Sequence, residues 1–249
     1  VVEHARTRGL AVMTVGEQGE AIRLVNREPT QLGQSLTVEH AGQERTIDLP
    51  LIGAYQVSNA LTAAGLALAT GTEASRVWDA VARLQPVRGR LERAAIAPSG
   101  APIYVDYAHT PDAIAAAVAA LRPHVSGRLI TVFGAGGDRD HGKRAPMGAA
   151  AAKASDVVIV TDDNPRGEDP ADIRRQVLEG APQAREIGGR REAILAAIAE
   201  AGAEDIVLVA GKGHETGQII GSGDNMRVLP FDDVDVAREC VAEIARGAA

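Results

Sequence analysis

The sequence predicts an α/β protein whose larger, C-terminal part carries a mostly parallel β-sheet covered by helices. Short runs that are apolar at every position, such as Val157–Val160, are typical of strands buried on both faces. From Ile103 onward such runs alternate with Ala- and Leu-rich stretches of helical length. Polar motifs follow these runs directly. Strand–helix alternation favours parallel strands, and ligands bind such sheets beyond the carboxyl ends of the strands.

Residues 1–94 have a different pattern, with strands first and helices after them. Apolar runs between polar turns predict a β-meander with strands at Leu10–Val15, Ala21–Val25, Leu36–Val38 and Thr46–Leu51. The stretch GAYQVSNALTAAGLALATG, ending at Gly71, predicts a helix, and Thr72 begins another that runs to about Leu84. The basic stretch Arg88–Arg93 ends this part, and APSGAP at 97–102 predicts a turn or a linker.

The rest of the chain alternates regularly between the two kinds of element. We expect strands at Ile103–Asp106, Leu129–Phe133, Val157–Thr161 and Ile206–Ala210. We expect helices at Pro111–Leu121, Ala145–Ala154, Pro170–Glu179, Arg190–Ala201 and Val234–Ala245. Proline begins two of these helices, and it fits there because the first helical N–H has no intrahelical partner.

Composition excludes several classes of function. The 249 residues are 45% apolar and 24% charged, as is typical of a soluble globular protein. The net charge of −7 argues against a general nucleic-acid binder, which needs a basic face. Cys240 is the single cysteine, so it excludes an internal disulfide, and we interpret it as a core residue. No apolar run has the length of a membrane span. The first residues, VVEHARTRGL, do not have the pattern of a signal peptide and do not begin with Met.

The stretch GAGGDRDHGKR follows the second strand of the predicted sheet. It has the G-x4-GK spacing of a P-loop, but Arg144 stands where Ser or Thr would hold magnesium. Asp138 and Asp140 would also place negative charge where phosphate binds. We favour a glycine-permitted loop that projects Arg139, a planar donor suited to a carboxylate. A surface loop of solvated charges is the alternative.

The stretch DDNPRGEDP follows the third strand. Pro165 has a fixed φ and favours an extended conformation for Asn164 before it. Asp163 can accept from an ammonium group, Asn164 can donate and accept, and Arg166 can bind a carboxylate. Together they suit an amino acid. A polar turn is the alternative, which explains Asp169 as a helix cap well and explains Arg166 poorly.

The motif GKGHE follows the fourth strand. Gly211 and Gly213 permit a close approach of the backbone, and Glu215 can bind an ammonium group. Lys212 and His214 can equally be structural or contact a ligand.

The motif DYAHTPD follows the first strand. Asp106 could bind a ribose hydroxyl, and His109 could meet a phosphate or a base. Arg90 lies near the expected junction, where it could be a surface ion-pair partner or a phosphate ligand.

These motifs, taken in order, resemble the Mur ligase family, and in it the members that add meso-diaminopimelate. The resemblance is carried by GAYQVSNALTAAG, GRLE, VDYAHTPDA, GGDRDHGKR, DDNPR and GKGHE, which run through nearly the whole chain. DDNPR with GGDRD before it and GKGHE after it is highly specific. The resemblance implies that 1–94 are the C-terminal part of a central ATP-binding domain, with its P-loop absent. It implies that 95–249 form a Rossmann-like, amino-acid-binding C-terminal domain.

The resemblance also implies a reaction and its partners. Such enzymes add meso-diaminopimelate to UDP-MurNAc-L-Ala-D-Glu in peptidoglycan precursor synthesis, through an acyl phosphate made with ATP and Mg²⁺. ATP and Mg²⁺ would be bound mainly by residues upstream of this chain. We expect a cytoplasmic monomer whose partners are these small molecules, with no nucleic acid or membrane.

The family's site residues can be carried over one by one. The residues expected to bind meso-diaminopimelate are Arg139, Asp163, Asn164, Pro165, Arg166, Gly211 and Glu215. The residues expected near ATP are Asn59, Arg90, Asp106 and His109. No catalytic residue and no metal ligand of the family falls within this chain. An arginine at 166 favours a substrate with a carboxylate at its far end, which lysine lacks.

Two departures from the family pattern limit what this chain is expected to do. Gln56 stands where the family has Asn, and the chain contains neither G-x4-GK[ST] nor the family's modified lysine. We therefore expect no turnover from these 249 residues alone. Two alternatives stay open: a sibling ligase with another substrate, such as a lysine-adding or folate-type synthetase, and a non-catalytic module that binds an amino acid or a nucleotide.

Overall fold

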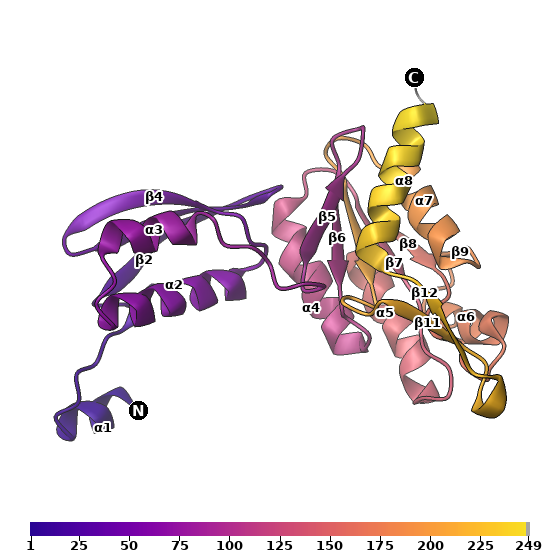
Figure 1. The fold of residues 1–249 in the computed structure, drawn as a ribbon, viewed down its shortest axis with the longest axis horizontal. Coiled ribbons are helices and arrows are strands. Elements are labelled where there is room, and N and C mark those ends of the chain that lie inside the picture. Colours follow the sequence, from indigo (N-terminus) through magenta and orange to yellow (C-terminus); the bar gives the residue numbers. More distant parts are fainter. Residues whose placement is uncertain (248–249) are drawn as a thin grey trace. The chain divides into compact units, whose positions relative to one another are not determined.

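The computed structural model describes residues 1–247 and divides into two compact units, Val1–Gln85 and Pro86–Ala249 (Figure 1). The division lies before the boundary expected near residue 94. Its physical basis is strand β5, Glu92–Ile96, which pairs with β6, Pro102–Asp106, in the sheet of the second unit. The stretch between these strands is a hairpin turn, closed by a 2.8 Å hydrogen bond from the Ala97 N–H to the Ala101 carbonyl.

The first unit is a four-stranded sheet, ordered β1-β2-β3-β4, with two helices packed on it. Its elements are α1 (Val2–Thr7), β1 (Val15–Gly16), β2 (Ile22–Thr30), β3 (Gly33–His40), β4 (Gln43–Leu49), α2 (Ala54–Ala69) and α3 (Ala74–Val81). Strands β2, β3 and β4 form the expected antiparallel meander. Helix α3 begins where the Glu73 carboxylate accepts from the backbone N–H groups of Ser75 and Arg76.

The strand expected at Leu10–Val15 is wrong except for its last residue. Leu10 and Met13 are 55% and 43% exposed, so their apolar side chains lie against no core. A short apolar run was the only signal there, and such a run does not show whether a neighbouring strand is present to pair with it.

The second unit contains a six-stranded sheet, ordered β5-β6-β10-β7-β8-β9. Its further strands are β7 (Leu129–Phe133), β8 (Val157–Val160), β9 (Arg185–Glu186) and β10 (Ile206–Ala210). All neighbours are parallel except β5 and β6, so the expected mostly parallel sheet is confirmed. The short strands β5 and β9 were not predicted, because neither is an apolar run.

Five helices cover the two faces of this sheet, and all five were expected. They are α4 (Pro111–Leu121), α5 (Arg144–Ala154), α6 (Pro170–Leu178), α7 (Arg190–Glu200) and α8 (Asp233–Gly247). Helices α7 and α8 share one core with alternate residues of the strands, including Ile130 and Val209, and with Cys240. Helices α4, α5 and α6 lie on the opposite face (Figure 1). None of the helices in residues 1–247 has the length and apolar character needed to span a membrane.

The register of the sheet brings the polar motifs together. Ala210 pairs with Asp106 on one side and with Phe133 on the other, and Phe133 pairs with Val160. The segments that follow these four strands therefore start at one edge of the sheet, as expected. An antiparallel hairpin, β11 (Gly217–Ile220) and β12 (Arg227–Pro230), comes after the fourth of them and was not predicted.

Candidate functional site

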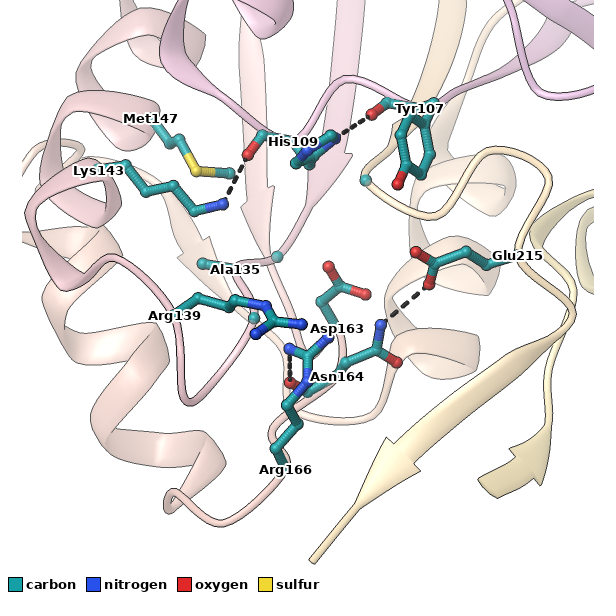
Figure 2. A pocket seen from close by; sticks show the side chains of 13 residues that line it. Tyr107, His109, Ala135, Arg139, Lys143, Met147, Asp163, Asn164, Arg166 and Glu215 are labelled. Atoms are coloured by element: carbon teal, nitrogen blue, oxygen red, sulfur yellow. Dashed lines mark hydrogen bonds between the residues drawn. The ribbon is translucent and has the colours of Figure 1, made fainter. Parts of the chain in front are cut away.

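A cavity of about 270 Å³ lies at this edge of the sheet (Figure 2). Its walls come from the loops after β6, β7, β8 and β10, and from the start of α5. The residues that line it are Tyr107, His109, Gly134, Ala135, Gly136, Arg139, Lys143, Met147, Asp163, Asn164, Arg166, Gly211 and Glu215. Six of the seven residues expected to bind the amino acid are therefore in one place.

Pro165 is the seventh, and it supports the cavity from behind. It is buried, and its carbonyl oxygen lies against the backbone of Gly137. A Cβ added at Gly137 would lie 1.9 Å from that oxygen, so only glycine permits the two loops to come this close. The role of Pro165 is thus to bring the loop after β8 against the loop after β7.

One side of the cavity is basic. The Arg166 guanidinium donates from Nη1 to the Gly137 carbonyl at 2.9 Å, which leaves its other N–H groups toward the cavity. Lys143 donates from Nζ to the His109 carbonyl at 3.0 Å. Arg139 has no ion-pair partner among residues 1–247, and its guanidinium lies beside that of Arg166 (Figure 2). Unpaired guanidinium groups that face one cavity are suited to a carboxylate.

The other side of the cavity is acidic and is organised by a buried lysine. Lys212 is fully buried, and its Nζ lies 3.3 Å from Asp163 Oδ1 and 3.6 Å from Glu215 Oε2. The same Nζ donates to Asn164 Oδ1 at 2.7 Å and to the Gly217 carbonyl at 2.9 Å. Lys212 is therefore structural, whereas the sequence had left it open. Asp163 and Glu215 carry two negative charges and Lys212 carries one positive charge, so an ammonium group from a ligand can balance the remaining negative charge.

The Asn164 side chain is fixed by its neighbours. Its Oδ1 accepts from Lys212 and, at 2.9 Å, from the Ile219 backbone N–H, while its Nδ2 donates to Glu215 Oε2 at 2.9 Å. The oxygen has two donors already, so Asn164 can offer a ligand only its remaining N–H. The sequence had predicted that it would both donate and accept.

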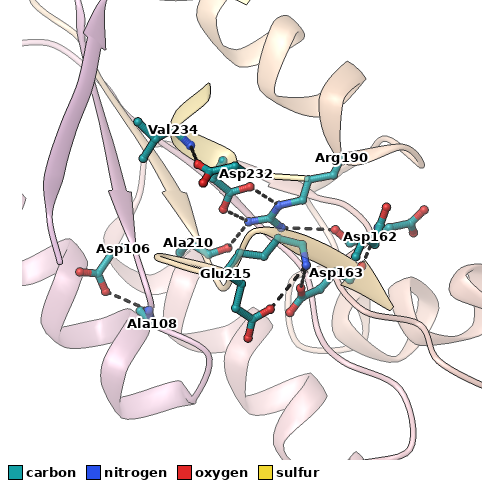
Figure 3. Close-up of polar contacts among 12 residues, drawn as sticks. Asp106, Ala108, Asp162, Asp163, Arg190, Ala210, Glu215, Asp232 and Val234 are labelled. Carbon is teal, nitrogen blue, oxygen red and sulfur yellow. Dashed lines mark hydrogen bonds and ion pairs between the residues drawn. The ribbon is translucent and has the colours of Figure 1, made fainter. Parts of the chain in front are cut away.

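A buried ion pair forms the floor beneath the cavity. Arg190 and Asp233 have fully buried side chains and two hydrogen bonds of 2.7 Å between them. The Arg190 guanidinium also donates to the carbonyls of Ala210, at 2.9 Å, and Asp162, at 3.3 Å (Figure 3). It thereby holds the ends of β10 and β8, from which Gly211 and Asp163 follow. Neither member of this pair was predicted as a site residue.

Of the residues expected near ATP, Asn59 belongs to the first unit, and Arg90, Asp106 and His109 belong to the second. His109 lines the same cavity as the amino-acid set. The Arg90 guanidinium lies 4.7 Å from the centre of the Tyr107 ring. In the first unit, Asn59 donates to Gln56 Oε1 at 3.2 Å, so Gln56 keeps an amide contact with its neighbour one helical turn away.

Asp106 is engaged by the protein backbone. Its carboxylate accepts from the Leu91 N–H at 2.8 Å and from the Ala108 N–H at 2.9 Å. Burial raises the pKa of this carboxyl group, against the lowering effect of both hydrogen bonds and of Arg90. Each oxygen thus has an internal donor, and the side chain fixes the turn after β6.

Comparison with known proteins shows the family of this chain. A family model described as "Mur ligase, glutamate ligase domain" matches residues 89–213.

The chain belongs to the Mur ligase family.

Curated relatives and solved structures extend this match. The UDP-N-acetylmuramoyl-L-alanyl-D-glutamate–2,6-diaminopimelate ligase of Zymomonas mobilis is 62% identical over 97% of this chain and 50% of its own length. The ligase of the same name from Caulobacter vibrioides is 54% identical over 92% of this chain and 46% of its own length. A solved structure of a ligase of this name is 34% identical, with a TM-score of 0.78 over 97% of this chain and 50% of that one. The chain spans about half the length of the curated relatives it matches.

The fold itself is shared more widely among Mur ligases and related enzymes. The UDP-N-acetylmuramate–alanine ligase of Thermotoga maritima is 20% identical, with a TM-score of 0.63 over 97% of this chain and 50% of that one. At that identity the likeness is one of fold alone.

Six cavity residues of this Mur ligase were not predicted from sequence: Tyr107, Gly134, Ala135, Gly136, Lys143 and Met147. Tyr107 and Lys143 lie within the motifs DYAHTPD and GGDRDHGKR. Their place inside these motifs was a signal that could have found them. Met147 is buried one turn into α5, and no chemical pattern marks it.

A second ion pair joins the two loops that carry the cavity guanidiniums. Arg144, fully buried, donates twice to Glu168, and these hydrogen bonds hold the Glu168 pKa at about 2, below its usual 4.5. A pKa depressed in the folded state contributes stability that is present above the ordinary pKa and is lost as pH falls through the folded value.

We therefore expect the free energy of unfolding of the wild type to fall more steeply than that of Glu168→Gln as pH drops from about 4.5 toward about 2. Urea denaturation at stepped pH values measures both slopes, and Arg175→Ala on the exposed face of α6 is a control. Parallel slopes for wild type and Glu168→Gln would contradict the assignment.

Proposed function

We propose that the second unit binds the amino acid that a Mur ligase adds, and that this amino acid is meso-diaminopimelate. One observation carries the proposal. The guanidinium groups of Arg139 and Arg166 and the carboxylates of Asp163 and Glu215 line one cavity of about 270 Å³. A carboxylate and an ammonium group on one carbon match this arrangement, because each charge meets donors or acceptors of opposite sign.

The binding mode follows from the ends of the ligand. Diaminopimelate carries an amino-acid group at each end of a short chain. One end would occupy the cavity, with its carboxylate against the arginines and its ammonium group against Asp163 and Glu215. The other end stays outside, and its amine is the nucleophile for amide bond formation. The residues of this unit bind and orient the nucleophile and take no part in bond making.

The same geometry favours diaminopimelate over lysine. For the α-amine of lysine to react, its ε-ammonium end must occupy the cavity, and that end has no carboxylate. Arg139 and Arg166 would then lack the anion that their positive charges require. A site built to bind a charged group rejects an analogue without it, because its own groups stay unpaired.

We propose that the whole protein catalyses the ATP-dependent addition of meso-diaminopimelate to UDP-MurNAc-L-Ala-D-Glu in the cytoplasm, as a monomer. The names of the relatives that match half of their length support this reaction.

The residues of this chain do not make an ATP site on their own. The carboxylate of Asp106 already has two backbone donors, and the loop nearest to a P-loop carries Asp138 and Asp140. Arg90 and His109 can add donors at its margin. We propose that ATP and Mg²⁺ bind mainly to residues outside these 249.

Substrate competition in the complete gene product tests the proposal. We expect kcat/KM for meso-diaminopimelate to exceed that for lysine roughly a hundredfold or more, because lysine lacks the distal carboxylate. 2-Aminopimelate keeps that carboxylate and lacks the distal ammonium group, so it should fall between the two. Equal use of lysine and diaminopimelate would overturn the proposal. We expect no ligation by residues 1–249 alone, and calorimetry on this chain measures amino-acid binding separately.

A further inference from the structure

We infer that the pair of Arg144, which is fully buried, and Glu168, which is partly exposed, is a positioning device for Arg139 and Arg166, and through them a determinant of specificity for the distal carboxylate. The inference rests on the proposed function, since it concerns how that carboxylate is bound. Neither member of the pair lines the cavity. Any effect of the pair on substrate must therefore pass through the residues that do.

The Arg144–Glu168 pair is a complete two-point contact. Arg144 Nη1 lies 2.8 Å from Glu168 Oε2, and Nη2 lies 2.8 Å from Oε1. Nη1 also donates to Gln176 Oε1 at 2.8 Å, and Nη2 donates to the Gly136 carbonyl at 3.1 Å. One guanidinium at the start of α5 thus holds the loop after β7, the loop after β8 and helix α6.

The pair acts directly on the residue before Arg139. Glu168 accepts from the backbone N–H of Asp138, and the Asp138 carboxylate accepts from the Gly167 N–H at 3.0 Å. Asp138 has a φ of 49°, a left-handed conformation that non-glycine residues rarely adopt and that needs support from its surroundings. Because Arg139 is the next residue, this conformation sets the direction in which its side chain leaves the loop.

The pair also lies next to the backbone that carries Arg166. Arg166 has a φ of 53°, and its backbone N–H and C=O bond to Ile219 and Gly221. Two further hydrogen bonds join the loop after β8 to the loop after β7: the Arg166 guanidinium donates to the Gly137 carbonyl, and the Gly137 N–H donates to the Asn164 carbonyl. Glu168 is two residues further on. The two cavity guanidiniums are therefore on loops that are joined by these bonds and by the bonds of Glu168 to Arg144 and Asp138.

Stability alone does not require this arrangement. An apolar pair of similar volume often stabilises a fold as well as a buried ion pair does. What an apolar pair lacks is direction, since it cannot orient the Asp138 N–H or the Gly136 carbonyl. The two directed hydrogen bonds between Arg144 and Glu168 are suited to holding Arg139 and Arg166 in fixed positions around one carboxylate.

Kinetics of Glu168→Gln in the complete gene product test the inference. We expect KM for meso-diaminopimelate to rise roughly 10- to 100-fold, because a small displacement of positioning groups has effects of this size. KM for ATP and for the UDP-linked substrate should stay unchanged. Glu168→Asp, which keeps the charge, should recover part of the loss.

Asp205→Asn is the matched control. Asp205 pairs with Arg128 at 2.7 Å at the opposite end of the same sheet, so its loss should lower stability and leave KM for diaminopimelate unchanged. A readout without ligand is amide hydrogen exchange, which should become faster at Gly137 and Gly167 in Glu168→Gln and not in Asp205→Asn.

The outcomes separate the two claims. If the wild type uses lysine as well as diaminopimelate, the proposed function is wrong. A selective wild type with an unchanged KM in Glu168→Gln, or with unchanged exchange at Gly137 and Gly167, overturns the positioning role alone.

Discussion

Arg166→Ala is expected to reduce kcat/KM for meso-diaminopimelate by about ten- to a hundredfold in the complete ligase while the fold stays intact. The substitution removes the proposed charge-assisted contact to the distal carboxylate, and such a contact contributes roughly 1.5–3 kcal/mol. The backbone is held independently by bonds from residue 166 to Ile219 and Gly221, which the alanine keeps. Steady-state kinetics with each substrate varied in turn measures the effect.

Two variants make this result specific. Arg166→Lys keeps the positive charge but loses the planar fork, so it should recover only part of the activity. Arg175→Ala removes an arginine of α6 whose side chain is 63% exposed and lies outside the cavity, and kinetics should not change. Unchanged kcat/KM in Arg166→Ala would show that the distal carboxylate is bound elsewhere.

Asp233→Ala is expected to lower the free energy of unfolding by roughly 3–5 kcal/mol, since breaking a buried ion pair leaves the Arg190 charge buried and unpaired. This is a large fraction of the roughly 5–15 kcal/mol that stabilises a typical domain. Arg190 also holds the carbonyls of Ala210 and Asp162, so amino-acid binding should weaken as well. Urea denaturation and calorimetry measure the two effects.

The control is an exposed ion pair between helices α7 and α8, the helices that Arg190 and Asp233 also join. Arg191 and Glu243 also join α7 and α8, but their side chains are exposed to solvent. Exposed pairs contribute little to stability, so Glu243→Ala should leave the urea midpoint nearly unchanged. Similar losses in Asp233→Ala and Glu243→Ala would indicate that burial does not set the cost.

The sheet of the second unit was predictable because its signals are local. The run Leu129–Phe133 is buried at every position, and Thr110 and Asp169 cap the helices that begin at the next residue. Strand β5 was missed because a basic stretch precedes it and Glu92 opens it. Its partner β6 lies across a turn, and pairing between segments is not visible in a local pattern.

The sequence predicted which charged residues line the cavity better than it predicted the role of each one. Charge types at strand ends identified Arg139, Arg166 and Glu215. The supporting layer was not identified, because nothing in the local sequence marks Arg190 or Arg144 as buried, and the role of Lys212 stayed open. Partners such as Asp233 lie 43 residues away in sequence, so no motif contains both members of the pair.

The attachment of Asn164 and Arg166 to strand β11 bears on how a new substrate preference could arise. Lys212, Ile219 and Gly221 bond to the DDNPR stretch from a segment about fifty residues later in the chain. Transplanting DDNPR alone into another scaffold would leave these partners behind, and the transplanted arginine would lose its orientation. A change of amino-acid preference therefore requires that both segments are inherited together. Recombination that separates DDNPR from the hairpin should yield inactive chimaeras.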